Sequence, residues 1–209
     1  MKLKHFVVGL TGGIGTGKSS ALEAFEQAGA STVSLDQIAH EQAKPGREGY
    51  RAIVRAFGKN IIVGAEGLID RRALGEKVFK SPAALRKLER ATHPIILREM
   101  ERLVRSMKGV VVVDVPLLFE KKLQKHFDAT VLIACNPAAQ LRRVTKRDGF
   151  TPVEARRRIK AQLPLATKRR LADHTIDNDK DLIALRAKVD AAHAGLALLY
   201  GGSPNGNPD

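Results

Sequence analysis

Residues 12–19 read Gly-Gly-Ile-Gly-Thr-Gly-Lys-Ser and fit the pattern G-x-x-x-x-G-K-[ST] at every fixed position. An apolar run at residues 6–10 precedes them as a predicted strand, and residues 20–28 follow as a predicted helix that ends at Gly29. The glycines let the backbone curl until its N–H groups point at a polyphosphate, beside the positive end of the helix dipole. The stretch therefore predicts a binding site for a nucleoside triphosphate.

Two side chains at the end of this loop have the chemistry that the site needs. Lys18 can reach the β- and γ-phosphates, and the Ser19 hydroxyl can hold Mg²⁺. The alternative is a glycine-rich turn that binds nothing, and the Lys-Ser pair together with the predicted flanking elements argues against it.

The composition is that of a globular α/β protein. The chain has 209 residues, of which 44% are hydrophobic and 28% charged, as is usual for soluble domains. Its one cysteine, Cys135, excludes an internal disulfide and ends an apolar run, which predicts a packed thiol. No stretch is long enough to span a membrane, so we expect a cytosolic protein with no membrane partner.

The net charge of +14 is concentrated in one segment. Eleven basic residues lie between Arg142 and Arg170, where only Asp148 and Glu154 oppose them. A concentrated charge favours a small polyanionic ligand. Nucleic acid is the alternative, but the chain has no Trp and two Tyr, and no aromatic residues are interleaved with the arginines.

Apolar runs alternate with amphipathic segments along the chain, the pattern of a parallel sheet covered by helices. The sequence predicts an α/β fold in three layers, with five parallel strands at residues 5–10, 32–35, 110–115, 129–134 and 174–177. We expect a nucleotide-binding core at 1–37, 108–137 and 171–201, a helical substrate-binding insertion at 38–107, and a basic helical lid at 138–170. The Gly/Pro/Asn-rich tail at 202–209 is expected to be disordered.

Helix boundaries can be predicted from capping residues. Ser81-Pro82 opens a helical stretch that His93-Pro94 should interrupt. Asn136-Pro137 opens another helix, which Gly149 ends, and Thr151 to Glu154 form a capping box. The last helix should bury one apolar face, composed of Leu182, Leu185, Val189, Ala192, Leu196 and Leu199.

Two carboxylates follow predicted strands. Asp36 comes directly after the second strand and could orient or deprotonate an attacking hydroxyl; the alternative is an N-cap of the next helix. Asp114 ends the apolar run 110–113 and could hold Mg²⁺ directly or through water; the alternative is a turn residue at the strand end.

Arg143 and Arg147 are four residues apart and therefore share one helix face, with Gln140 beside them. Two guanidinium groups brought over a triphosphate by a closing lid would neutralise charge on the transferred phosphoryl group. Ordinary surface arginines are the alternative.

Taken together, these residues resemble the dephospho-coenzyme A kinase family over residues 7 to about 178. The loop motif alone is generic, whereas the later motifs and their order are much more specific. The resemblance is carried by residues 9–19, Asp36–His40, Leu68–Leu74 with Val78 and Phe79, His93–Ile95, Asp114–Glu120, Gln140–Arg143 with Arg147 and Asp148, and Ala172–Asn178.

The resemblance implies a P-loop kinase fold and transfer of the ATP γ-phosphate to the ribose 3′-hydroxyl of dephospho-coenzyme A, the last step of coenzyme A synthesis. It implies Lys18, Asp36 and Arg143 as catalytic residues, Ser19 as a Mg²⁺ ligand, and ATP and dephospho-coenzyme A as the partners. We expect a monomer, with an oligomer as the alternative. The implied nucleotide-binding set is Thr11, Gly13, Ile14, Gly15, Thr16, Gly17, Lys18, Ser19, Ser20, Arg143 and Arg147.

One position departs from the family. The family often has Asp-x-Asp after the second strand, whereas Ser34 takes the first place here and Asp36 remains. We expect Asp36 to be the working residue.

Three other functions are compatible with parts of the sequence. The nearest is another small-molecule kinase of the same architecture, such as a nucleoside monophosphate or shikimate kinase, against which the mid-chain insertion and Pro-Leu-Leu-Phe-Glu argue. An ATP-dependent nucleic-acid binder would use the basic segment. A regulator would bind nucleotide without turnover.

Overall fold

The computed structural model describes residues 5–201, so the tail predicted to be disordered lies outside the described residues. The chain divides into two compact units, one formed by residues up to 33 together with those from 104 on, and the other by residues 34–103. The substrate-binding and lid roles expected for residues 38–107 and 138–170 stay predictions.

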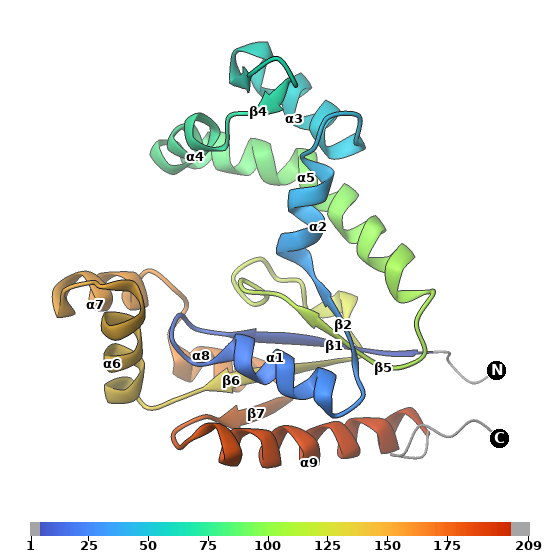
Figure 1. The fold of residues 1–209 in the computed structure, drawn as a ribbon, viewed down its shortest axis with the longest axis vertical. Helices are drawn as coiled ribbons and strands as arrows, with labels where there is room; N and C mark the ends of the chain where they lie inside the picture. The colour runs from blue at the N-terminus through green and yellow to red at the C-terminus, as the bar shows by residue number, and fades with distance from the viewer. Residues whose placement is uncertain (1–4, 202–209) are drawn as a thin grey trace. The chain divides into compact units, whose positions relative to one another are not determined.

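The first unit is built on a five-stranded parallel sheet (Figure 1). The strand order is β2-β5-β1-β6-β7, so the strand that leads into the glycine-rich loop is central. The prediction of a three-layer α/β fold with five parallel strands is confirmed. The strands are β1 (His5–Gly12), β2 (Ser31–Ser34), β5 (Gly109–Asp114), β6 (Ala129–Ala134) and β7 (His174–Asp177).

Helices of this unit cover the sheet and extend beyond its carboxyl edge. They are α1 (Lys18–Gln27), α6 (Pro137–Asp148), α7 (Pro152–Lys160), α8 (Leu165–Leu171) and α9 (Leu182–Tyr200), with a 3-10 turn η2 (Gln124–His126). The predicted caps are confirmed: Asn136 opens α6, Gly149 ends it, and the Thr151–Glu154 capping box opens α7.

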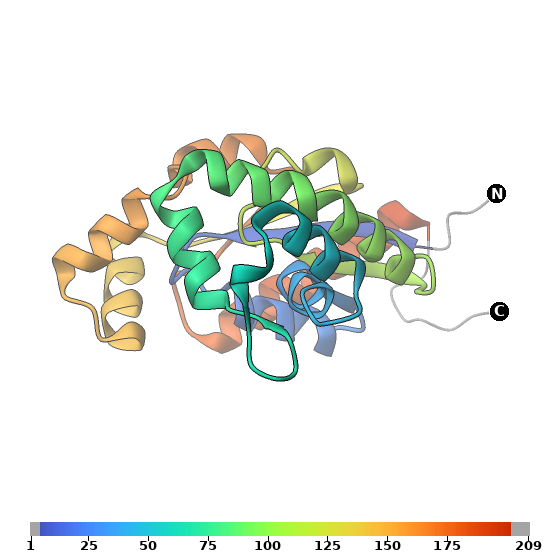
Figure 2. The same cartoon turned by 90° about the horizontal axis from the view of Figure 1, so that it is seen from above.

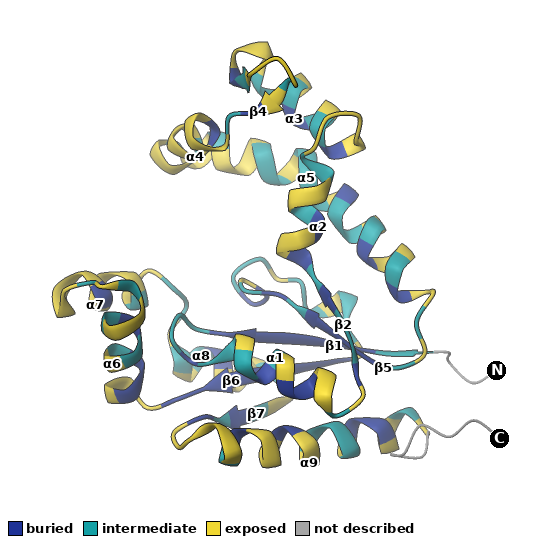
Figure 3. Ribbon diagram, viewed as in Figure 1, coloured by how far each residue is buried: buried dark blue, intermediate teal, exposed yellow. Residues whose placement is uncertain are grey.

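The main core lies between one face of the sheet and helices α1 and α9, which contact each other. Alternate residues of the strands point into it, among them Val8, Val112 and Ile133, and Phe25 of α1 meets them. Figure 3 shows the strands mostly buried while much of the outer surface of α9 is exposed. The sheet is therefore held in place by side chains at period two from the strands and by apolar helix faces.

Two residues of the predicted α9 face are not buried. Leu185, Val189 and Leu196 join the core, whereas Leu182 and Leu199 are exposed. Both lie in the terminal turns of the helix, outside the stretch that packs on the core. The helical spacing of these two residues places them on the apolar face. It does not show how far along the helix the core extends.

The second unit is helical, with a small antiparallel hairpin that pairs Ile62 with Ile69. A core of Ile53, Ile61, Ile69 and Leu74 holds it together. Its elements are α2 (Leu35–Gln42), α3 (Glu48–Phe57), η1 (Lys59–Ile61), β3 (Ile62–Val63), β4 (Leu68–Ile69), α4 (Arg71–Lys80) and α5 (Pro82–Val104).

The predicted interruption at His93-Pro94 is wrong, because α5 continues through Pro94 as one helix (Figure 2). Proline removes one backbone hydrogen bond and crowds the preceding turn, at a cost of about 3 kcal/mol. Burial of Ile95 and Met100 after the proline favours continuation, because the apolar stripe keeps its helical period across Pro94. None of the helices in residues 5–201 combines the length and the apolar character that crossing a membrane requires.

Gly9 of β1 provides a test of the packing on the other face of the sheet. A Cβ at this position would lie 2.6 Å from Leu118 Cδ1 and 2.9 Å from the Phe127 ring. We expect Gly9→Ala to lower the free energy of unfolding by about 1–3 kcal/mol, because the site is filled. Urea denaturation measures this change.

The matched control is Gly195→Ala in α9, where an added Cβ meets nothing within 4 Å. It should raise the free energy of unfolding by about 0.5–1 kcal/mol, through helix propensity alone. Equal effects of the two substitutions would contradict the packing described for β1.

Candidate active site

The loop between β1 and α1 has the curled backbone that the sequence predicts. The N–H and the hydroxyl of Thr16 both donate to the carbonyl of Gly13, at 3.2 and 2.8 Å. Gly15 and Gly17 have φ angles of 75° and 89°, which favour glycine. Gly17 is the N-cap of α1 and makes no side-chain capping bond, and the first turn contains no acidic residue. The positive end of α1 is therefore suited to an external anion.

A buried asparagine holds the loop from the side of β7. Asn178, 6% exposed, donates from Nδ2 to the carbonyl of Thr16 at 2.8 Å. A Cβ on Gly17 would lie 2.2 Å from that nitrogen. Glycine is thus required at residue 17 both by its φ angle and by the approach of Asn178. The sequence motif contained Asn178 but gave it no role.

Two glutamines bind the peptide groups of Ile14. Gln140 of α6 donates from Nε2 to the Ile14 carbonyl at 2.9 Å, and the Ile14 N–H donates to Oε1 of Gln162 at 2.9 Å. Sequence reasoning placed Gln140 beside the lid arginines and missed Gln162. No local signal could have found it, because Gln162 lies 148 residues after its partner and in no recognised pattern.

Lys18 and Asp114 form an ion pair at the carboxyl edge of the sheet. Lys18 lies in the first turn of α1 and Asp114 at the end of β5, and both side chains are largely buried, at 16% and 15% exposed. The structure thus brings together two residues that the sequence singled out separately. Asp114 is more than a turn residue here, because it sets where the Lys18 ammonium lies. Thr11 lies nearby at the end of β1, buried, with its hydroxyl donating to the Pro116 carbonyl at 3.4 Å.

Ser19 and Ser20 lie in the first turn of α1, where Ser19 is exposed. A hydroxyl oxygen next to bound phosphates suits Mg²⁺, which prefers oxygen ligands and usually keeps several waters. No group of three or more His, Cys, Asp or Glu side chains within residues 5–201 could hold a metal ion. The Ser19 hydroxyl is thus a donor of the kind that this cation accepts, and the role of Ser19 as its ligand stays a prediction.

The two lid arginines lie in different surroundings. Arg143 is partly buried, its Nη2 donates to the Lys180 carbonyl at 3.4 Å, and its Nη1 is buried with no hydrogen-bond partner among the described residues. Arg147 is exposed and binds Asp148 through Nε and Nη2, at 2.7 and 2.9 Å. Arg143 thus has a donor to spare, whereas the Arg147 guanidinium is occupied by its neighbour.

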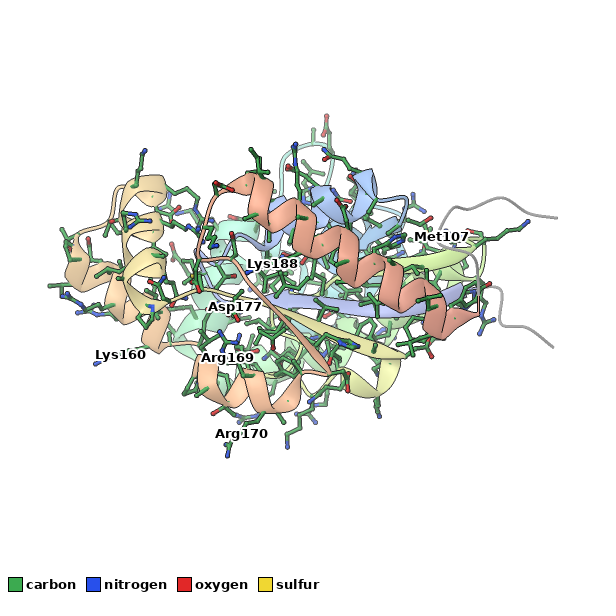
Figure 4. The ribbon with its side chains drawn as sticks, turned by 90° about the horizontal axis from the view of Figure 1, so that it is seen from below. Met107, Lys160, Arg169, Arg170, Asp177 and Lys188 are labelled. Atoms are coloured by element: carbon green, nitrogen blue, oxygen red, sulfur yellow. The ribbon has the colours of Figure 1, made fainter. Side chains whose placement is uncertain are left out.

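The segment after β7 is tied to the same edge. Asp177 lies between Arg169 of α8 and Lys188 of α9 (Figure 4): Arg169 pairs with its carboxylate, and Lys188 Nζ donates to its carbonyl at 2.5 Å. The Arg169 hydrogen bond holds the pKa of Asp177 below its ordinary value. Asp179 accepts from the Asn136 N–H at 2.6 Å, at the start of α6. The loop after β7 therefore joins the phosphate loop to the beginning of the predicted lid.

Asp36 belongs to the other unit, where it lies exposed in the first turn of α2. The N-cap of α2 is Ser34, whose hydroxyl accepts from the Gln37 N–H at 3.3 Å. The alternative that Asp36 caps this helix is therefore wrong. Ser34, in the place where the family often has its first Asp, performs the capping.

Cys135 is the packed thiol that the sequence predicts, at 1% exposed. Burial raises the pKa of this thiol above its usual 9.0, more than the nearby Arg143 lowers it. A neutral buried thiol is a poor nucleophile, which excludes Cys135 from covalent chemistry.

Comparison with known proteins agrees with this geometry. A sequence model of the dephospho-CoA kinase family matches residues 6–183. A dephospho-CoA kinase of Methylococcus capsulatus is 39% identical over 194 residues, which cover 92% of this chain and 98% of that protein. The chain belongs to the dephospho-CoA kinase family. The enzyme class and the last step of coenzyme A synthesis, both predicted from the sequence, are thereby confirmed.

Solved structures of dephospho-CoA kinases and similar proteins share the fold. The crystal structure of TT1252 from Thermus thermophilus is 31% identical, with a TM-score of 0.79, over 93% of this chain and 99% of that one. Dephospho-CoA kinase from Campylobacter jejuni is 26% identical, with a TM-score of 0.68, over 93% and 98% of the two chains.

The Pro-Leu-Leu-Phe-Glu motif of the resemblance ends in a buried ion pair. Glu120 Oε1 lies 2.7 Å from Nζ of Lys168, which is 1% exposed. The same oxygen accepts from the Leu163 N–H at 3.2 Å. Burial raises the pKa of Glu120, but Lys168 and the backbone N–H groups together lower it by more. The pKa therefore lies below its ordinary value of 4.5.

Gly17→Ala tests whether the loop conformation is required for nucleotide binding. The strained φ angle and the displaced Asn178 should weaken ADP binding by about tenfold or more, since the loop N–H groups lose their alignment. Calorimetric titration measures the affinity. In the control Gly29→Ala, φ is also positive, at 98°, but nothing lies within 4 Å, so affinity should stay within about twofold while stability falls. Equal affinity of the Gly17→Ala and Gly29→Ala proteins would contradict this role.

The Glu120–Lys168 pair predicts a pH dependence. The pKa of Glu120 is lower in the folded protein than in the unfolded chain. The ionised carboxylate therefore adds to the free energy of unfolding above about pH 4.5, and this stabilisation is lost as the pH falls through the folded-state pKa. We expect Glu120→Gln to lower the free energy of unfolding by about 3 kcal/mol at pH 7. The difference from wild type should be constant near neutral pH and shrink on acidification below about pH 4.5, as measured by urea denaturation from pH 7 to well below pH 4.5. A constant difference would show that Glu120 is not ionised in the folded protein.

Proposed function

We propose that the triphosphate of Mg-ATP binds in the loop at residues 12–19 and that the γ-phosphate passes from there to the ribose 3′-hydroxyl of dephospho-coenzyme A. The observation that carries this assignment is Lys18, held by Asp114 at the edge of the sheet beside an uncapped helix N-terminus. In a member of the dephospho-CoA kinase family, this is the arrangement that a transferred phosphoryl group requires.

The chain's own residues supply charge and position. Phosphoryl transfer involves little covalent chemistry for a protein to perform, so positioning and neutralisation of charge provide most of the catalysis. Lys18 would exchange its contact with Asp114 for a contact with phosphate oxygens. Arg143 would turn its unpartnered Nη1 toward the developing negative charge. Arg147 would join it after giving up Asp148.

Magnesium enters this scheme with the nucleotide. When bound, the cation neutralises phosphate charge and orients the β- and γ-phosphate oxygens. Ser19 is the residue that we propose as its protein ligand.

Asp36 is proposed to face the accepting hydroxyl and to orient it or take its proton. Its support is the resemblance, together with the finding that Ser34, rather than Asp36, caps α2. The carboxylate is thus not required for the helix itself. Since Ser34 has a capping role, we infer that this chain works with the one carboxylate of Asp36.

The helical unit contains a cavity of about 310 Å³ that is suited to part of the acceptor. The side chains that line it are mostly apolar and include Ile53, Ile69, Leu74 and Val78. Arg71 also lines the cavity. Apolar pockets of this size with a few polar groups are typical of small-molecule sites. We propose that it takes an apolar portion of dephospho-coenzyme A.

Part of the basic segment is paired within the protein. Arg147 binds Asp148, Lys168 binds Glu120 and Arg169 binds Asp177, while Arg158 stacks on Phe150 with 4.1 Å to the ring centroid. These internal contacts reduce the charge that the segment offers to a nucleic acid, and nucleic-acid binding stays the alternative that a salt-dependent binding assay tests. The cytosolic location and the monomeric state stay predictions.

Kinetics of two variants test the assignment. Lys18→Ala should reduce kcat/KM by about 10²-fold or more, because a charge that stabilises the transition state is lost. Asp36→Asn should reduce kcat by about 10- to 100-fold, since the loose transition state limits what a base can contribute. ADP release with and without dephospho-coenzyme A measures both, and the mass of the product shows whether one phosphate was added.

Ser34→Ala is the control for Asp36→Asn, because it removes the cap of the same helix. It should lower stability by about 1 kcal/mol and leave kcat within about threefold. Full activity of Asp36→Asn would refute its role. If wild-type protein binds ATP but its ADP release is not stimulated by dephospho-coenzyme A, the protein transfers phosphate to another acceptor. A panel of nucleotides and small alcohols would then identify that acceptor.

A further inference from the structure

The two glutamines that bind Ile14 have no part in the scheme above. Gln140 is 8% exposed and lies on α6, the helix that also carries Arg143 and Arg147. Gln162 lies between α7 and α8. One donates to the Ile14 carbonyl and the other accepts from the Ile14 N–H. The two peptide groups that flank Ile14 are thus each bound by one side chain, which fixes the backbone orientation at Ile14, in the middle of the phosphate loop.

The place of Gln162 is itself determined by the buried ion pair. Its neighbour Leu163 donates its N–H to Glu120, and Glu120 pairs with Lys168 of α8. Among the described residues, Glu120 Oε2 has no hydrogen-bond partner, and Lys168 Nζ has only its ion pair with Glu120 Oε1. A buried charged pair keeps its geometry because separating the charges in this environment is costly. The segment that carries Gln162 is therefore anchored to the loop after β5.

Gln140, Gln162 and Lys168 also line one cavity of about 230 Å³, and Gly13 of the phosphate loop lines it as well. Both ends of the α6–α7 pair thus reach the phosphate loop: Gln140 follows the start of α6 by three residues, and Gln162 follows the end of α7 by two. Between them lie Arg143 and Arg147.

We propose that Gln140 and Gln162 form a clamp on the Ile14 peptide groups that places α6, the helix carrying Arg143 and Arg147, relative to the bound phosphates, with the Glu120–Lys168 pair as its anchor. The two glutamines are positioning residues for phosphoryl transfer. A displacement of about 1 Å at a reacting group can cost about 10²-fold in rate, so loss of one clamp bond should be visible in kcat. This inference rests on the proposed binding of ATP in the loop.

Two substitutions at Gln162 should have opposite kinetic effects. Gln162→Met keeps the size of the side chain but cannot accept the Ile14 N–H, so kcat should fall about tenfold while the KM for ATP changes less than threefold. Gln162→Glu still accepts that N–H, so kcat should stay within about threefold while the KM for ATP rises, because a carboxylate repels the phosphates. A merely structural role would not produce this split. Gln27→Met, at the exposed end of α1, is the matched control and should leave both constants unchanged.

The anchor is tested by a double-mutant cycle. Because Lys168→Met alone would leave a buried carboxylate unpaired, Glu120→Met and Lys168→Met are combined. This variant should lose about tenfold in kcat, and adding Gln162→Met should cost less than a further twofold, since the two changes remove the same constraint. Multiplication of the two effects to about 100-fold would refute the anchor.

Failure of the clamp and failure of the proposed function are distinguishable. Wild-type protein that transfers no phosphate to dephospho-coenzyme A contradicts the proposed function. Active wild-type protein with an equally active Gln162→Met variant contradicts the clamp alone. A lower KM for ATP with unchanged kcat in Gln162→Met would also overturn it, because Gln162 would then compete with phosphate for the Ile14 N–H.

Discussion

The phosphate loop must present its N–H groups inward, which turns its carbonyl groups outward, and each of these needs a partner. In this chain the Gly13 carbonyl is bound by Thr16 within the loop, the Ile14 carbonyl by Gln140 and the Thr16 carbonyl by Asn178. The partners come from α6 and from the end of β7, far along the chain. Much of the architecture around the carboxyl edge of the sheet follows from this requirement, because unpaired buried backbone groups are costly.

Several charged side chains form ion pairs near the carboxyl edge of the sheet. The ammonium of Lys18 is paired with Asp114, and Lys168 and Arg169 of α8 are paired with Glu120 and Asp177. A chain with a net charge of +14 thereby stays compact around a site that has to be positive. Arg143, with one buried donor unpartnered, stands apart from these pairs, and it lies on the helix that the sequence predicted to act on phosphate.

The strands, the loop and most helix ends could be predicted because their signals are local. Alternating apolar runs indicate strands, and caps such as Asn136 and Thr151 mark helix starts within three residues. Local rules failed where packing decides, as at Pro94, where the apolar stripe continues through the helix, and at Leu182 and Leu199, where the helix face extends past the core. The candidate site divides in the same way. Lys18 and Ser19 follow from a motif, whereas Gln162 and the anchor at Lys168 depend on contacts between distant segments.

The most direct test of the account is a crystal structure of the protein with Mg-ADP and dephospho-coenzyme A bound together. We expect the β-phosphate within hydrogen-bond distance of the loop N–H groups and of Lys18 Nζ, and the Asp36 carboxylate facing the ribose 3′-hydroxyl. Gln140 and Gln162 should still bind the peptide groups of Ile14. A nucleotide bound elsewhere, or a 3′-hydroxyl with no carboxylate near it, would contradict the assignment of this site.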